Sequence, residues 1–109
     1  MNSTPKPLDH VRVLLSVHRA LLMAITPEMR AIDVSWNDSE IRLRFVLARE
    51  SNYDMNEITN EVEAEIEGDF LPEARVTSTV EVIPTGNPIE LLNPLNGDCR
   101  RVFELREFE

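Results

Sequence analysis

The sequence has few of the residues that build cross-links, metal cages or membrane spans. It contains a single cysteine, Cys99, so it can form neither an internal disulfide nor a zinc site made of thiolates. It has no uninterrupted apolar run long enough to cross a bilayer. The N-terminus does not look like a secretory signal, because Arg12, His18 and Arg19 interrupt the apolar residues that follow it. We therefore expect a cytoplasmic protein that makes no membrane contact.

Glycine is also scarce. Only three of the 109 residues are glycine, while 42% are hydrophobic, which favours a folded globule over a disordered chain. This length suits one domain and does not suit two. We expect a single domain over residues 1–109, with residues 1–6 as a loose polar lead-in.

One long segment lacks basic residues altogether. Between Arg49 and Arg75 there is no lysine or arginine, but there are nine acids: Glu50, Asp54, Glu57, Glu61, Glu63, Glu65, Glu67, Asp69 and Glu73. The whole chain has 20 acids and 11 bases, so the remainder has 11 of each, and this segment accounts for the net charge of -9. Such a balance argues against nucleic acid or an anionic membrane as partner and favours a basic protein.

The acidic segment has the periodicity of a helix. Its apolar residues recur at helical spacing, at Met55, Ile58, Val62 and Ile66. Ser51 and Asp54 predict the start of the helix, and Gly68 before Pro72 predicts its end. Packing the apolar stripe on a core leaves an exposed ridge of Asp54, Glu57, Glu61 and Glu65. Like charges at this spacing cost roughly 0.2–0.5 kcal/mol per pair, so the ridge is either a solvated face or a docking surface.

The other elements predict an α+β fold of order α-β-β-α-β-β. A first helix is expected from Pro7 to Ile25, largely buried, with His18 in its apolar stripe. Residues 32–36 and 41–47 alternate as a hairpin whose outer face carries Arg42, Arg44 and Arg30. Further strands are expected over residues 75–83, with Val76, Val80 and Val82 on one face, and over residues 100–108, with Phe103 and Leu105 inward and Arg101 exposed. The expected sheet is four-stranded and mainly antiparallel, with both helices on one face. The long connection Pro84–Asp98 is expected to fold back on the domain.

No pattern of catalytic or metal-binding residues emerges. His10 and His18 lie eight residues apart, about 12 Å along a helix, too far to share a metal. Cys99 has no evident base partner, and a buried or half-buried role is expected for His18. The carboxylates lie on a helix and lack the glycine-containing loop of an EF-hand. We expect a protein that is not an enzyme and that carries no cofactor and no metal.

Four stretches together resemble a known family. They are HRALLMAITPEMRAIDVSW (18–36), IRLRFVL (41–47), EVEAEIEGDFLPEARVTSTVEVI (61–83) and RRVFELRE (100–107). Their pattern is similar to that of small acidic bacterial immunity proteins encoded beside contact-dependent and other polymorphic toxins. The resemblance implies a non-catalytic inhibitor of a cognate toxin. The chain departs from the pattern at Met23, where the family has glycine, and in its longer loop over residues 84–98.

Charge and resemblance together give a hypothesis about the binding site. A toxin that cuts nucleic acid needs a basic cleft, which an anionic surface can cover. We expect Asp54, Glu57, Glu61 and Glu65 to pair with basic residues of such a nuclease, with Tyr53 as an aromatic contact. Trp36 is a second aromatic candidate unless it belongs to the core, which is the better interpretation. The alternative is an adaptor module without a toxin, possibly a homodimer joined through a sheet edge, and the long loop and the Arg42/Arg44 face are alternative epitopes.

Overall fold

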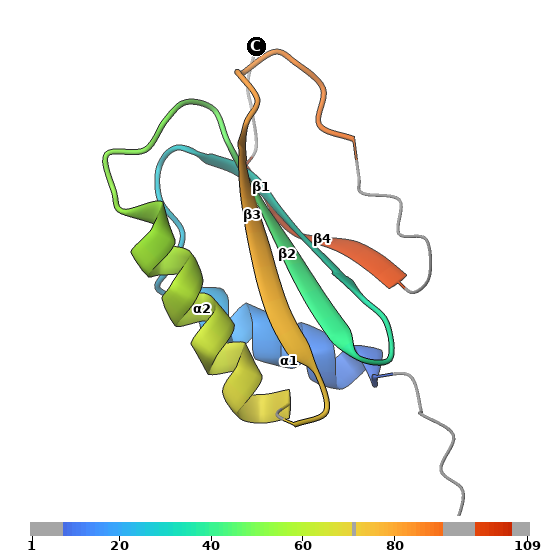
Figure 1. Cartoon of the computed structure of the whole chain (residues 1–109). Helices are drawn as coiled ribbons and strands as arrows, with labels where there is room; N and C mark the ends of the chain where they lie inside the picture. The colour runs from blue at the N-terminus through green and yellow to red at the C-terminus, as the bar shows by residue number, and fades with distance from the viewer. Residues whose placement is uncertain (1–7, 71, 91–97, 106–109) are drawn as a thin grey trace, which may run out of the picture.

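The computed structural model describes residues 8–70, 72–90 and 98–105. Two helices and four strands follow one another in the predicted order (Figure 1). They are α1 (His10–Leu21), β1 (Met29–Trp36), β2 (Glu40–Leu47), α2 (Met55–Phe70), β3 (Arg75–Val82) and β4 (Asp98–Glu104). The α+β class and the order α-β-β-α-β-β are confirmed.

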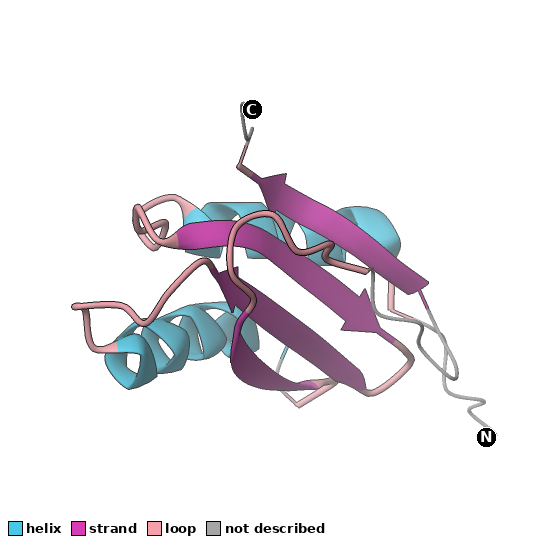
Figure 2. Ribbon diagram, turned by 90° about the horizontal axis from the view of Figure 1, so that it is seen from above, coloured by secondary structure: helices cyan, strands magenta, loops and turns pink. Residues whose placement is uncertain are grey.

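The four strands form one mixed sheet in the order β3-β2-β1-β4. The pairs β1–β2 and β1–β4 are antiparallel, while β2 and β3 run parallel. The parallel pair follows from the chain order, because α2 serves as the crossover that parallel neighbours require. Both helices cover the same face of the sheet (Figure 2). A mainly antiparallel sheet with two helices on one face was predicted correctly. The strand order places β3 at one edge, where it forms the single parallel pair with β2.

The core lies between the helices and the inner face of β1 and β2. The hairpin supplies alternate residues to it: Ile32, Val34, Trp36, Ile41, Leu43, Phe45 and Leu47. Val62 and Ile66 of α2 pack against them, as the apolar spacing predicts, and Phe70 at the end of α2 joins them in the core. Trp36 is only 4% exposed, so it is a core residue and cannot serve as an interface aromatic.

Helix α1 is shorter than predicted and turns a different side to the core. It begins at His10, where the Asp9 carboxylate accepts a 2.9 Å hydrogen bond from the Val11 amide, and it ends at Leu21. Its buried residues are Val13, Ser16, Val17, Ala20 and Leu21, whereas Val11, Leu15 and Leu22 are exposed. His18 is exposed as well, so its predicted place in the apolar stripe is wrong. Because α1 has apolar residues on both sides, helical periodicity alone could not select the buried one.

The outer face of the hairpin is buried too, which corrects the prediction of an exposed arginine surface. Arg42 is exposed, but Arg30 and Arg44 are buried. The Asp33 side chain has no exposed surface and accepts from the guanidinium of Arg44 at 3.3 Å and of Arg101 at 2.7 Å. Arg44 also pairs with Glu81 at 2.7 Å, and this pairing raises the pKa of Arg44 above its usual value. A charged network therefore lies where a solvated face was expected.

Residues 83–90 cover this network. Arg30 donates to the carbonyl oxygens of Ile83 and Pro84 at 2.9 and 3.0 Å. Arg44 donates to the carbonyl of Glu90 at 2.7 Å. The segment crosses the face of the sheet opposite the helices (Figure 2). The expectation that the connection folds back is confirmed over residues 84–90, while residues 91–97 lie outside the described part of the chain.

Helix α2 and strand β4 also differ from the predictions. Helix α2 continues through Gly68 to Phe70, so Gly68 does not end it. Strand β4 starts at Asp98 and is described to Glu104, with a register shift opposite Ile32 and Asp33. After this shift Phe103 packs against the core as predicted, but Leu105 is exposed. Arg101, predicted to be exposed, is half-buried against Asp33.

Candidate functional site

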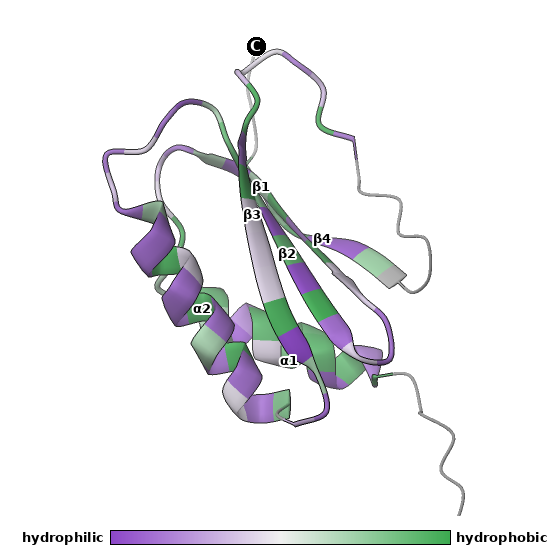
Figure 3. Ribbon diagram, viewed as in Figure 1, coloured by the Kyte–Doolittle hydropathy of each residue, from purple (hydrophilic) through white to green (hydrophobic). Residues whose placement is uncertain are grey.

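The predicted acidic ridge lies along the solvent side of α2. Glu57, Glu61 and Glu65 are all exposed, and no hydrogen bond or ion pair joins their carboxylates to another residue in the described ranges. They occupy successive turns of a helix whose outer side is hydrophilic (Figure 3). Three uncompensated negative charges therefore follow one another along one line of the surface.

The first two predicted site residues precede this line. Tyr53 is 55% exposed in the loop before α2. The Asp54 carboxylate accepts hydrogen bonds from the backbone amides of Asn56 at 3.0 Å and Glu57 at 3.2 Å, which caps the helix. Asp54 is exposed as well, so its charge adds to the field of the ridge, but its hydrogen bonds are used within the helix.

A groove lies beside the ridge, and no local pattern in the sequence predicts it. A hollow of about 100 Å³ lies between α2 and the end of α1, and its lining includes Glu61 and Glu65 beside Ala20, Met23, Ala24, Ile58 and Val62. Met23 is 96% exposed. The two alanines leave the hollow open because they have little side chain to fill it. Among the apolar residues of the lining, Met23 is exposed and Ile58 is half-buried, while Ala20, Ala24 and Val62 are buried. The ridge thus lies beside accessible apolar side chains, and protein interfaces typically combine polar groups with such apolar contacts.

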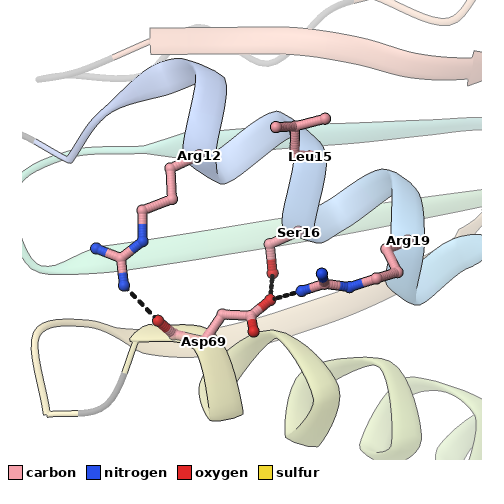
Figure 4. A pocket seen from close by; sticks show the side chains of 5 residues that line it. All are labelled: Arg12, Leu15, Ser16, Arg19 and Asp69. Atoms are coloured by element: carbon pink, nitrogen blue, oxygen red, sulfur yellow. Dashed lines mark hydrogen bonds and ion pairs between the residues drawn. The ribbon is translucent and has the colours of Figure 1, made fainter.

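The remaining acids of α2 are partly engaged within the molecule. At the end of the helix the Asp69 carboxylate accepts a 2.6 Å hydrogen bond from the Ser16 hydroxyl and pairs with Arg19 (Figure 4). Arg12 donates to the Asp69 carbonyl oxygen at 2.5 Å and to the Glu73 carboxylate at 3.2 Å. These arginines offset negative charge at the helix terminus where it is unfavourable. Among the described residues, these arginines therefore neutralise only the last turn of α2 and the turn after it, and the glutamates of the ridge remain uncompensated.

The ion pair and hydrogen bonds of Asp69 make the stability of the fold depend on pH. The hydrogen bond from Ser16, followed by the charge of Arg19, lowers the pKa of Asp69. A carboxylate with a lowered folded pKa stabilises the fold above its unfolded pKa, and this contribution disappears as the pH falls through the folded value. We expect Asp69→Asn to unfold more easily than wild type at neutral pH and equally easily in acid. Urea unfolding of wild type and Asp69→Asn over a pH series measures the two stabilities. A difference between their unfolding free energies that stays constant with pH would refute the stabilising role of the Asp69 carboxylate.

The histidines and the cysteine form no catalytic arrangement with one another in the structure. His10 and His18 are exposed on α1. Cys99 is buried in β4, and burial raises the pKa of its thiol, which opposes formation of a reactive thiolate. No group of three or more histidine, cysteine or acidic residues able to hold a metal is found in the described ranges. These residues give no support to a catalytic function.

Comparison with known families relates this geometry to a biological role. Residues 10–104 match the model of a family described as MafI2 immunity protein. The chain belongs to the MafI2 immunity protein family. The match spans all six secondary-structure elements, and the resemblance to immunity proteins of polymorphic toxin systems is confirmed. No curated protein matches the chain.

Membership in the MafI2 immunity family implies a cognate toxin as the partner. None of the helices that the structure describes is long and apolar enough to cross a membrane. Because the family implies a protein partner, the ridge with its groove is the candidate binding surface.

Proposed function

We propose that this MafI2 immunity protein binds its cognate toxin in the cytoplasm and blocks a basic, nucleic-acid-binding surface of a nuclease domain. The residues that would make the contact are Tyr53, Asp54, Glu57, Glu61 and Glu65. The observation that carries the proposal is the run of three exposed glutamates without partners in the described structure, beside the exposed Met23. A nuclease needs cations to hold phosphates, so an anionic helix is complementary to its substrate cleft.

The contact would combine two physical effects. The carboxylates steer the toxin toward the ridge and pair with its arginines and lysines, which gives speed and selectivity. The exposed Met23 and the half-buried Ile58 would contact hydrophobic surface of the toxin. Burial of apolar surface stabilises a complex by roughly 25 cal/mol for each Å². Inhibition then follows from occlusion, because the cleft that is filled by α2 no longer admits nucleic acid.

The first test is to identify the partner and its activity. The product of the neighbouring toxin gene, inactivated by mutation, should be captured by this protein from solution. The active toxin should degrade nucleic acid, and an equimolar amount of this protein should stop the degradation. A captured toxin that acts on something other than nucleic acid would refute the nuclease assignment and leave the immunity function intact.

Electrostatic steering also predicts a salt dependence. The association rate constant should approach 10⁸–10⁹ M⁻¹s⁻¹ at low ionic strength and fall by roughly tenfold or more as salt is raised, with a much smaller change in the dissociation rate. Stopped-flow mixing with the inactivated toxin measures both constants. An association rate that does not respond to salt would show that the ridge does not guide the encounter.

A further inference from the structure

Strand β3 is an open edge of the sheet. It is the first strand in the order β3-β2-β1-β4, and in Figure 1 it lies nearest the viewer with no other element in front of it. Its eight residues pair with β2 in an unbroken register, and it contains no proline, no lysine and no bulge. Natural proteins normally protect edge strands with such features. The other edge strand, β4, is interrupted by a register shift against β1.

The hydrogen bonds to β2 show which backbone groups of β3 point outward. The amide of Arg75 donates to the Ser39 carbonyl at 3.0 Å, and the amide of Ile83 donates to the Leu47 carbonyl at 2.8 Å. Because these directions alternate along a strand, the odd-numbered residues bond to β2. The amide and carbonyl groups of Val76, Ser78 and Val80 therefore face away from the sheet.

We propose that β3 pairs antiparallel with β3 of a second copy of this chain, about a two-fold axis through Ser78. In this register Ser78 lies opposite its own copy, and Val76 lies opposite Val80. All of these residues have outward-facing backbone groups, so the register forms closely spaced pairs of N–H···O hydrogen bonds. The two sheets become one continuous sheet, which is an isologous interface of the kind that homodimers use.

The side chains of β3 are complementary to themselves in this register. Arg75 of one copy lies opposite Glu81 of the other, twice per dimer. Arg75 is exposed. Both hydrogen bonds from Arg44 to Glu81 go to Oε2, and Oε1 accepts none from the residues that the structure describes. Thr77 lies opposite Thr79. Opposite charges and matched threonines are favourable across strands.

On the face of the sheet that carries the helices, β3 exposes apolar side chains that a second copy could cover. Val80 and Val82 are 41% and 47% exposed, and they align with Phe45 and Leu47 of β2, whose side chains are in the core. They therefore lie on the helix side of the sheet, at positions that the molecule's own helices leave uncovered. Pairing about Ser78 brings Val76 of the second copy beside Val80.

One like-charge approach opposes this pairing. The Ser78 hydroxyl donates to the carboxylate of Glu63 on α2, so the axis at Ser78 brings the two copies of Glu63 toward each other. We expect Glu63→Gln to tighten the dimer by a few-fold. The glutamates of the ridge are not affected, because Glu61 and Glu65 line the groove between α2 and α1. A dimer would leave both ridges free to bind toxin.

The first experiment measures the oligomeric state of the full chain. Light scattering after size exclusion should give twice the chain mass of 12.5 kDa. Val80→Pro removes an amide that faces outward and spares the bonds to β2, a position where an edge strand tolerates proline, so this variant should have half the mass with an unchanged circular dichroism spectrum. Val80→Thr keeps the amide and should remain dimeric. A monomeric wild type, or a dimeric and folded Val80→Pro variant, would overturn the proposal.

The second experiment tests the register. Thr77 and Thr79 are exposed, and they form a non-hydrogen-bonded pair with Cα atoms about 4.5 Å apart, within the range of a disulfide. A mixture of Thr77→Cys and Thr79→Cys chains should form a covalent dimer under mild oxidation. Each variant alone should not, and these samples also control for Cys99. Cross-linking of either variant alone, or none in the mixture, would contradict pairing about Ser78.

Discussion

Reversal of Glu57, Glu61 and Glu65 to lysine is expected to weaken toxin binding by more than about a hundredfold, or roughly 3 kcal/mol. Each lysine replaces an attraction to the basic residues of the toxin with a repulsion at the same position of the ridge. The fold should be retained, because these side chains are exposed and have no partners among the described residues. Titration calorimetry with the inactivated toxin measures the affinity, and thermal unfolding of the free variant verifies that it is folded.

A charge-matched control separates a local contact from a change in net charge. The pair Glu61→Lys and Glu65→Lys alters the net charge by the same amount as the pair Asp38→Lys and Glu90→Lys. Asp38 and Glu90 are also exposed, but they lie in the β1–β2 turn and in the segment that crosses the outer face of the sheet. The ridge pair should lose most of the affinity, and the control pair should lose little. Equal losses would mean that the toxin responds only to total charge.

Replacement of Asp33 by alanine is expected to cost about 3–5 kcal/mol of folding free energy. The Asp33 carboxylate is fully buried between Arg44 and Arg101, so its removal leaves two guanidinium groups with one counterion fewer beneath residues 83–90. Glu81 and Glu104 still pair with these arginines, which favours the lower part of the range. Urea unfolding measures the loss.

Two comparisons make this expectation specific. Asp38→Ala removes an exposed carboxylate from the turn and should change stability by no more than about 0.5 kcal/mol. Exchange of the Ile83 and Asn87 amides, which donate to the carbonyls of Leu47 and Pro84, should accelerate in Asp33→Ala. The reason is that Arg30, Arg44 and Arg101 hold this segment on the sheet through its carbonyl groups. If Asp33→Ala were as stable as Asp38→Ala, the charged network around Asp33 would not stabilise the fold.

The elements with strict periodicity could be predicted from sequence. The hairpin follows from the alternation of apolar and polar residues around Ile32 and Val34. Helix α2 follows from its apolar residues, which all lie on one side of the helix, so only that side can pack on the core. The ridge was predicted for the same reason, since burial of Val62 and Ile66 leaves Glu57, Glu61 and Glu65 outside. Local patterns were sufficient where one face of an element was clearly apolar.

Features that depend on distant parts of the chain could not be predicted in this way. The alternating pattern of β2 places Arg44 on the face predicted to be exposed. Arg44 is buried there because the segment that ends at Glu90, whose carbonyl accepts a hydrogen bond from Arg44, covers it 46 positions later in the chain. The groove at Met23 forms only when the end of α1 meets α2. The position of β3 at the edge of the sheet depends on the side of β2 to which α2 carries the chain. In each case the deciding contact is tertiary and leaves no signal in local periodicity.

The most direct test of the central claim is the structure of the complex with the cognate toxin. It should place lysine or arginine side chains of the toxin within ion-pair distance of Glu57, Glu61 and Glu65, with an apolar toxin side chain in the groove beside Met23. A complex in which this side of α2 faces solvent, while another surface of the immunity protein contacts the toxin, would contradict the proposed mode of inhibition.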